Sequence, residues 1–411
     1  MITDTSSSLH ETHDTPQHTT CCIVGSGPAG MMLGLLLARQ DIPVTVLEAH
    51  HDFERDFRGD TLHPSILELL DSLSLADIVL SLRHTKARTL RLQLSDQVTL
   101  SIDFRHLRTR FPYITMLPQS DFLAFLSIEA QQYPTFEIMM GARVEELIEE
   151  DGVIRGIRYR HNNETHELRA LLTVGADGRF SRIRRLAGFK FIATAPPMDV
   201  LWFHIPRQPD DPDMAMGRFA NGNGAIMLNR FEHWQIGYVI AKGSYQQLRE
   251  KGIQALQQSV ARLLPQFTDR LHSVREWKSV SLLSVEAGRV RRWYKPGLLL
   301  IGDAAHTMSP VGGVGINYAI QDAVVTANVL IRRLKTKVIS PRHLAAVQCR
   351  REIPTRVIQS FQSFVQKRII TQALDSQRQI KLPFFIKFPI VQKLIAHLIA
   401  FGVWPVKLRS A

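Results

Sequence analysis

Apolar residues in the first fifty positions follow a strand–helix–strand order. Thr20–Val24 is a short, β-branched apolar run that ends at glycine, which is typical of a buried strand. Pro28–Gln40 has the length and the opening proline of a helix, and Pro43–Glu48 is a second strand-like run. A strand, a glycine turn, a helix and a strand within about thirty residues form a βαβ unit, so this region is predicted to build a parallel sheet.

The middle of the chain has a different pattern. Strand-like stretches at Arg88–Phe104 and Val200–Ile240 are broken by Pro, Asp, Asn and Gly. Val153–Tyr159 and Glu167–Val174 alternate like an antiparallel hairpin. These segments predict a sheet-rich domain that is inserted into the first domain.

The remaining apolar segments return the chain to the first domain. Leu298–Ile301 is a predicted buried strand, Gly315–Leu334 is a long helix, and the chain is helical after Pro341. The fold class is therefore α/β, a Rossmann-type dinucleotide-binding domain with an inserted antiparallel-sheet substrate domain and C-terminal helices. The expected parts are a disordered leader at 1–18, a dinucleotide-binding domain at 19–87, 105–190 and 285–335, a substrate domain at 88–104 and 191–284, and a helical segment at 336–411.

The C-terminal segment carries the positive charge of the chain. Residues 331–411 contain 16 Lys and Arg but only 2 acidic residues, whereas the whole chain has a net charge of +12. A solvated outer face of the C-terminal helices explains this charge, and an anionic membrane surface or an acidic partner is the open alternative. Nucleic-acid binding is not expected, because no recognised nucleic-acid motif accompanies the charge.

The apolar stretch Leu382–Trp404 is not expected to span a membrane. Its longest charge-free run, Leu394–Val406, has 13 residues, whereas a spanning helix needs about 20. Pro383, Pro389 and Pro405 interrupt it further. A peripheral membrane contact through this basic segment stays open.

Cysteine content and the N-terminus point to the cytoplasm. The three cysteines, Cys21, Cys22 and Cys349, give neither a disulfide framework nor zinc-ligand spacing, so no metal site is expected. Residues 1–18 are polar and lack the apolar core of a secretory signal.

The first motif with chemical meaning is Gly25-Ser26-Gly27-Pro28-Ala29-Gly30. Gly25 allows a tight turn, Gly27 lets the backbone approach a pyrophosphate, and Gly30 permits close helix–strand packing. The following helix N-terminus presents free N–H groups to phosphate. Glu48 ends the next strand, where a carboxylate accepts hydrogen bonds from ribose hydroxyls.

Two later motifs also follow predicted strands. Gly175-Ala176-Asp177-Gly178 precedes a short basic helix and can equally be a turn with a helix-capping aspartate. Gly302-Asp303-Ala304-Ala305-His306 leads into Pro310-Val311-Gly312-Gly313-Val314-Gly315-Ile316-Asn317. An aspartate there can bind a sugar-alcohol chain, and the loop N–H groups can face the electron-rich end of a flavin ring, so FAD is the predicted cofactor. His306 is interpreted as structural.

Together the three motifs resemble the single-component (class A) FAD-dependent aromatic monooxygenases, the para-hydroxybenzoate hydroxylase-like family, over about Thr20 to Leu334. The resemblance implies that FAD contacts Gly25, Gly27, Pro28, Ala29, Gly30, Glu48, Arg58, Gln119, Asp177, Asp303, Pro310, Gly312, Gly313, Gly315 and Asn317. It further implies transient binding of NAD(P)H beside the flavin, in agreement with the absence of a second GxGxxG. The implied reaction is O₂-dependent hydroxylation of a small aromatic or polyketide-like substrate through a flavin C4a-hydroperoxide.

Three other functions stay open. The basic, apolar C-terminus would suit a flavin-dependent reductase of isoprenoid-like substrates, as in the geranylgeranyl-reductase-like proteins. A flavin-dependent halogenase is disfavoured by the lack of Trp-x-Trp-x-Ile-Pro. A Rossmann binding module without redox function has no need of the Asp303 and Gly312 motifs.

The substrate side offers aromatic residues on two predicted strands. Alternation places Trp202 and His204 on one face of the first strand and Trp234 and Tyr238 on one face of the second. They could line an apolar pocket with His204 as a base for a phenol, or they could be core residues, as aromatic stripes on strands usually are.

Overall fold

The computed structural model describes residues 17–54, 60–94, 99–212, 214–220, 222–375, 386 and 388–409. Of the predicted leader at 1–18, only Gln17 and His18 are among them, and both belong to strand β1 (Gln17–Val24), so the strand begins earlier than expected. Arg58, which the family resemblance placed beside FAD, lies outside the described residues.

A parallel sheet forms the centre of the first part, as the βαβ pattern predicted. β1 lies between β2 and β11, and both pairings are parallel. The path through the sheet is β19-β20-β11-β1-β2-β8. Its other strands are β2 (Val44–Glu48), β8 (Phe136–Met140), β11 (Glu164–Gly175), β19 (Tyr294–Lys295) and β20 (Leu298–Leu300).

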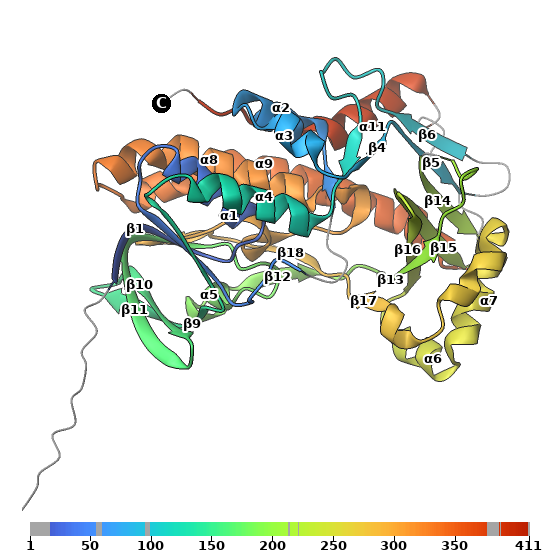
Figure 1. Ribbon diagram of the computed structural model, residues 1–411, viewed down its shortest axis with the longest axis horizontal. Coiled ribbons are helices and arrows are strands. Elements are labelled where there is room, and N and C mark those ends of the chain that lie inside the picture. Colours follow the sequence, from blue (N-terminus) through green and yellow to red (C-terminus); the bar gives the residue numbers. More distant parts are fainter. Residues whose placement is uncertain are drawn as a thin grey trace, which may run out of the picture.

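Helices cover one side of this sheet. Figure 1 shows α1 (Pro28–Ala38), α4 (Gln119–Gln131) and α8 (Gly315–Lys335) together on that side, with α9 (Pro341–Val365) next to α8. Every residue of α1 from Ala29 onward is buried, because the helix lies between the sheet and its neighbours. This burial explains why the helix is apolar on all sides.

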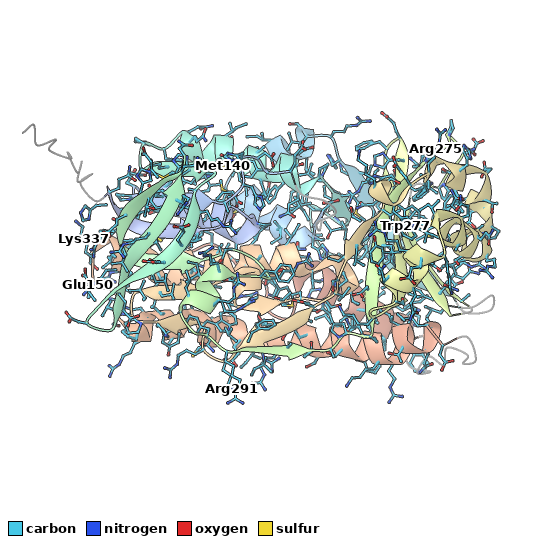
Figure 2. The ribbon with its side chains drawn as sticks, turned by 90° about the horizontal axis from the view of Figure 1, so that it is seen from below. Met140, Glu150, Arg275, Trp277, Arg291 and Lys337 are labelled. Carbon is cyan, nitrogen blue, oxygen red and sulfur yellow. The ribbon has the colours of Figure 1, made fainter. Side chains whose placement is uncertain are left out.

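The predicted hairpin is confirmed as part of a longer ladder. β10 (Val153–His161) pairs antiparallel with β11 and with β9 (Arg143–Glu150). The three strands project from the parallel sheet, and Glu150 at their tip lies at one end of the molecule, with Trp277 near the other end (Figure 2).

The second part is a seven-stranded sheet in the order β17-β13-β16-β15-β14-β5-β6. All of its pairings are antiparallel except that of β5 with β14. The strands are β5 (Thr89–Gln93), β6 (Thr99–Asp103), β13 (Met198–Pro206), β14 (Ala215–Ala220), β15 (Asn223–Arg230), β16 (His233–Ala241) and β17 (Ser281–Leu283). Helices α6 (Tyr245–Glu250) and α7 (Ile253–Leu263) lie against it (Figure 1).

Smaller elements join the two parts. β12 pairs antiparallel with β18. These elements are β3 (Thr61–Leu62), α2 (Pro64–Ser72), α3 (Ala76–Ser81), β4 (Thr85–Ala87), β7 (Ile114–Met116), α5 (Arg182–Leu186), β12 (Phe191–Thr194), the 3₁₀ turns Pro265–Ser273, Trp277–Ser279, Gly302–Ala304 and Val311–Gly313, β18 (Ala287–Val290) and β21 (His306–Thr307).

The C-terminal helices contact both parts of the molecule. α9 (Pro341–Val365) lies along α8, and its continuation through the π-helical turn Gln366–Ile370 and α10 (Thr371–Ala373) reaches the seven-stranded sheet. The basic side chains of α9 at Arg342, Arg350 and Arg356 are exposed, which fits a solvated outer face.

Two apolar helical stretches among the described residues bear on the question of a membrane span. α11 (Pro389–Phe401) has 13 residues, which is too short to cross a bilayer. The apolar helical stretch Val311–Lys335 is long enough, but 78% of its most apolar window is buried inside the protein, as in the core helix of a globular domain.

Candidate functional site

The sequence motifs meet at one edge of the parallel sheet. Gly25 follows β1, Glu48 ends β2, Asp177 follows β11 and Asp303 follows β20. The four strands are parallel neighbours in register, so their carboxyl ends are level. This is the edge at which open α/β sheets bind ligands.

Each glycine of the first motif is required for a different structural reason. Gly25 has φ +104°, and a Cβ there would lie 2.6 Å from Ala176 O. A Cβ on Gly30 would lie 1.9 Å from Gly25 O, because the helix crosses the turn closely. A Cβ on Gly27 would meet no atom within 4 Å, so this residue borders open space at the N-terminus of α1. No side chain caps that terminus, which leaves N–H groups for a phosphate.

Glu48 is held beside this turn. Its Oε2 accepts hydrogen bonds from Ser26 N (3.0 Å) and Ser26 Oγ (2.8 Å), and its Oε1 accepts one from His50 N (3.0 Å). The carboxylate is nearly buried. It is therefore fixed at the end of β2, where the sequence predicted a ribose-binding acid.

The Asp177 carboxylate is used inside its own loop. It accepts hydrogen bonds from Ser181 Oγ (2.5 Å), Arg182 N (2.6 Å) and Ile183 N (3.0 Å). Burial raises its pKa, and these bonds act in the opposite direction. The helix-capping interpretation of this aspartate thus accounts for the observed geometry, and a direct contact with the cofactor stays a prediction.

Arg184 joins this loop to the Asp303 motif, a role that the sequence did not reveal. Its guanidinium donates to Ala304 O (3.0 Å), Asp303 O (3.4 Å) and Arg179 O (2.6 Å), and it lies 4.3 Å from the centre of the Phe191 ring. In the sequence it is one arginine within a basic run, and only burial distinguishes it from its exposed neighbour Arg185.

Replacing Arg184 with Met should loosen both loops. Three main-chain carbonyls would lose a charged donor, so we expect FAD to bind at least about tenfold more weakly and the protein to lose roughly 1–3 kcal/mol of stability. Arg185→Met on the same helix is the control and should change neither quantity. FAD titration followed by quenching of flavin fluorescence measures the affinity, and equal affinity in the two variants would contradict the expectation.

The third motif forms a loop that leads into α8. Gly312 and Gly313 have φ +81° and +63°, and Gly315 is the first residue of the helix. Asn317 Nδ2 donates to Gly313 O and Thr61 O, both at 3.2 Å. No side chain caps the N-terminus of α8, which leaves its first N–H groups for a ligand. Their contact with a flavin ring stays a prediction.

Gln119 lies at a junction between the two parts of the molecule. It is the first residue of α4, and its main-chain N–H donates to the Asp60 carboxylate. Asp60 in turn pairs with Arg230 of the seven-stranded sheet at 2.5 Å. The Gln119 side chain makes no hydrogen bond within the part of the chain that the structure describes.

His306 is structural, as interpreted from the sequence. Its Nε2 lies 2.6 Å from Asp322 Oδ2, while Arg351 Nε donates to Asp322 Oδ1 at 2.7 Å. Gly302 N also donates a hydrogen bond to the Asp322 carboxylate at 2.9 Å. The buried Asp322 group therefore fixes the main chain at the start of the Asp303 loop. Burial alone would raise the pKa of Asp322, but His306 and Arg351 hold it at about 2.

The two faces of the seven-stranded sheet separate the substrate candidates. Trp234 and Tyr238 are fully buried under α7, where Trp234 Nε1 donates to Asp211 and Tyr238 bonds to Asn223. The pocket interpretation is therefore wrong for these two residues, and they belong to the core. Trp202 lies on the opposite face, which we call the inner face because its apolar residues belong to a cluster that Val311 of the flavin-ring loop also packs against.

His204 shares the inner face but is exposed near the end of β13. Its ring centre lies 4.4 Å from that of His233. Partial desolvation lowers the pKa of His204 to about 4, and the charges of His233 and Arg230 act in the same direction. The lowered pKa makes the imidazole a weak proton acceptor for a phenol, which weakens its case as a base.

We expect His204→Gln to leave the pH dependence of turnover unchanged between about pH 5.5 and 9, because the ring titrates only near pH 4. The measurement is the rate of NAD(P)H oxidation as a function of pH with a saturating substrate. An inflection that is present in the parent and missing in the variant would restore His204 as a base.

The assembled edge fits a dinucleotide on structural grounds. It has open space over Gly27, two uncapped helix N-termini, and a fixed carboxylate at Glu48. Residues 18–360 match a family model that is described as an FAD binding domain. The chain belongs to this family.

Similar proteins of known activity indicate which reaction this family member catalyses. 6-Methylpretetramide 4-monooxygenase of Streptomyces rimosus is 33% identical over 397 residues, which cover 96% of this chain and 94% of that protein. Para-nitrophenol 4-monooxygenase of a Pseudomonas strain is 25% identical over 339 residues, covering 76% and 78% of the two chains. The resemblance to aromatic monooxygenases is thus confirmed: the chain is an FAD-dependent monooxygenase, with NAD(P)H as the usual electron donor of the family.

Solved structures share the fold. PqsL of Pseudomonas aeruginosa, described as a probable FAD-dependent monooxygenase, gives a TM-score of 0.75 at 21% identity and covers 88% of this chain and 98% of its own. OxyS anhydrotetracycline hydroxylase of Streptomyces rimosus gives 0.73 at 21% identity, with 96% and 78% covered. The predicted α/β class is therefore confirmed.

Proposed function

We propose that this monooxygenase hydroxylates a planar, polycyclic aromatic molecule of the polyketide type in the cytoplasm. The observation that carries the proposal is the similarity to 6-methylpretetramide 4-monooxygenase along nearly the full length of both chains. The para-nitrophenol relative and the solved complex of PqsL with 2-aminobenzoylacetate favour aromatic substrates more generally.

The inner face supports a flat apolar substrate. Trp202 lies directly over Gly237, where a Cβ would come within 2.7 Å of its ring, and Phe219 lies in the same way over Gly224. Both aromatic side chains therefore lie against the sheet. With Val200, Ile226 and Val239 they form an apolar wall, which would exclude water from a reacting centre beside it.

The residues at the sheet edge would hold the cofactor in an extended arrangement. The N-terminus of α1 and Gly27 would bind the pyrophosphate, Glu48 the ribose, and Asp303 the ribitol chain. The N-terminus of α8 would face the electron-rich end of the ring and favour negative charge there. Bound FAD supplies electron transfer from NAD(P)H to O₂.

Two alternative activities have less support. Digeranylgeranylglycerophospholipid reductase of Thermoplasma volcanium matches 210 residues at 26% identity, or 48% of this chain. The flavin-dependent brominase Bmp2 has a TM-score of 0.76 but only 15% identity, so it shares the fold alone.

The test is a substrate screen with the FAD-loaded protein in air. We expect polycyclic phenols to stimulate NAD(P)H oxidation with matching O₂ uptake and to gain one oxygen atom in mass. Stimulation by single-ring phenols alone would overturn the substrate class. NAD(P)H oxidation without O₂ uptake, together with saturation of an alkene, would favour the reductase.

Trp202 gives a sharper test of the inner face. Its indole Nε1 is buried and has no hydrogen-bond partner within the described residues, so it is a candidate donor to the substrate. We expect Trp202→Phe to raise KM about five- to tenfold, the loss of roughly one hydrogen bond, with unchanged FAD affinity. Trp234→Phe, which changes a tryptophan on the opposite face, should lower stability without moving KM. Equal KM values for Trp202→Phe and the parent would remove this role.

A further inference from the structure

Helix α9 presents a row of buried glutamines to the segment that carries the flavin motifs. Gln348, Gln359, Gln362 and Gln366 are buried and lie on one side of the helix and its continuation. Gln348 Nε2 donates to Arg291 O (2.7 Å) and its Oε1 accepts from Trp293 N (3.0 Å). Gln359 Nε2 donates to Gly288 O (3.0 Å) and Thr307 O (3.2 Å).

A carboxamide suits this position because it donates and accepts hydrogen bonds without carrying charge. The segment from Gly288 to Val311 meets α9 through main-chain groups of both kinds. Unpaired, each buried group would cost about 1–3 kcal/mol. The glutamine row therefore joins α9 to the core through hydrogen bonds, without placing a charge in the buried interface.

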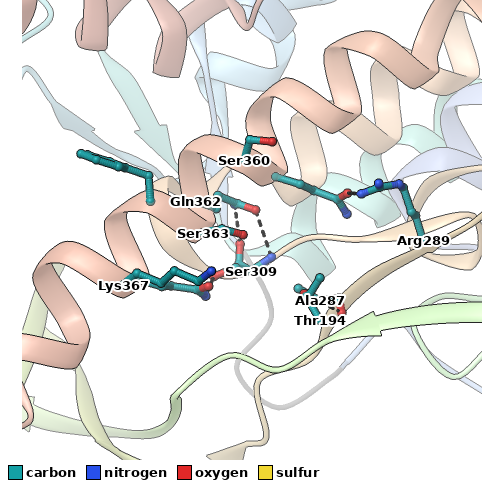
Figure 3. Close-up of a pocket in the computed structure, with 11 residues that line it drawn as sticks. Thr194, Ala287, Arg289, Ser309, Ser360, Gln362, Ser363 and Lys367 are labelled. Carbon is teal, nitrogen blue, oxygen red and sulfur yellow. Dashed lines mark hydrogen bonds between the residues drawn. The ribbon is translucent and has the colours of Figure 1, made fainter.

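Gln362 acts at the start of the flavin-ring loop. Its Oε1 accepts from Ser309 N (3.2 Å), and its Nε2 donates to Ser309 O (2.8 Å) (Figure 3). The same Nε2 also donates to Val311 O (2.9 Å). These bonds span Pro310, which has no N–H of its own. Gln366 Nε2 adds a bond to Ser309 Oγ at 2.7 Å.

The other end of the loop is held independently. Gly313 O accepts from Thr61 Oγ1 (2.8 Å) and from Asn317 Nδ2 (3.2 Å). Asn317 Oδ1 accepts from His63 N, and His63 Nδ1 contacts Ile399 O of α11 at 2.6 Å. The short loop between Ser309 and Gly313 is thus held by hydrogen bonds at both of its ends. Residues of α9 and its continuation hold the first end, and α11 supports the second through His63.

We propose that Gln362 is a positioning residue for the flavin ring. Its carboxamide fixes the positions of the Pro310 and Val311 main chain. Through them it sets the direction in which the loop N–H groups face the ring. This inference rests on the proposed flavin site. It gives the C-terminal segment a part in setting the electron affinity of FAD, since N–H groups aimed at the ring stabilise the charge of its reduced form.

The surroundings of Gln362 make the test practicable. A cavity of about 340 Å³ lies beside it, lined also by Arg289, Ser309 and Lys367 (Figure 3). Gln362→Met keeps the length of the side chain and removes all three hydrogen bonds. Gln348→Met also removes three hydrogen bonds, two to main-chain groups and one to Glu352, nearer the N-terminus of α9 and away from the loop, and is the matched control.

The experiment measures the visible spectrum and the two-electron reduction potential of FAD in the loaded variants. We expect Gln362→Met to lower the ratio of reduced to oxidised flavin at fixed potential about tenfold, which corresponds to about 30 mV, because misaligned N–H groups stabilise the reduced ring less. We also expect it to alter the absorption bands. Gln348→Met should lower stability and leave both flavin properties at the parent values.

Identical flavin properties in Gln362→Met and the parent would overturn the proposal, and so would equal changes in the two variants. Should Gln362→Met not fold, Gln366→Met is expected to give a smaller shift in the same direction, and no shift there overturns the proposal too. A parent chain that binds no FAD would instead contradict the flavin site itself.

Discussion

Gly30→Ala is expected to produce a protein that is strongly destabilised and retains no FAD. The new Cβ would lie 1.9 Å from Gly25 O, a main-chain atom that cannot move without displacing the whole turn. Overpacking of this kind typically costs about 1–3 kcal/mol, and more against backbone. The bound-flavin absorbance of the purified protein and its thermal midpoint measure the two effects.

Gly27→Ala is the matched variant that separates binding from folding. Its backbone has φ −67° and ψ −179°, which alanine adopts freely, and its Cβ would meet no protein atom within 4 Å. We expect parent-like stability and an FAD dissociation constant raised at least about tenfold, because the methyl group would occupy the space of the pyrophosphate. Parent-like FAD affinity in Gly27→Ala would contradict placement of the pyrophosphate at this turn.

Asp322→Asn should cause the second large effect. The substitution leaves Arg351 and His306 in a dry site without their counter-charge, and breaking a buried pair in this way costs about 3–5 kcal/mol. The control is Asp71→Asn, which removes one carboxylate of an exposed pair with Arg110 and should cost about 1 kcal/mol or less. Urea unfolding followed by tryptophan fluorescence gives both values, and similar midpoints for the two variants would contradict the expectation.

The contribution of Asp322 should depend on pH with a definite sign. Its pKa in the folded protein is about 2, below the value of about 3.9 for an unfolded aspartate. A lowered pKa stabilises the fold at pH values above the unfolded pKa, and this stabilisation is lost as the pH falls toward 2. The difference in unfolding free energy between parent and Asp322→Asn should therefore be constant from pH 5 to 8 and shrink between about pH 4 and 2.

The parts of the site that could be predicted from the sequence are those made by neighbouring residues. Gly25 to Gly30 form their turn with one another and with the adjacent strand ends, so their spacing alone specifies the geometry. The same holds for Asp177, whose partners lie four to six residues away. The capping alternative was visible in the sequence for that reason.

Residues that act across long separations could not be found in this way. Arg184 bonds to a carbonyl 120 positions away, and Gln362 bonds to Ser309 across 53 positions. A lone arginine or glutamine in a helix carries no local sign of such a partner. Trp234 and Tyr238 show a related limit, because a period of two places side chains on a common face without indicating which face meets the flavin.

The order of strands along the chain bears on how the protein is made. β1 is synthesised early, yet β20, which lies beyond β11 in the same sheet, comes about 270 residues later, after all strands of the seven-stranded sheet. On the ribosome the seven-stranded sheet can therefore form while the parallel sheet still lacks β20 and leaves an apolar edge unpaired. Such pairings form slowly and expose hydrophobic surface to aggregation. We expect the nascent chain to depend on chaperones until α8 and α9 have emerged, and FAD to bind only after release.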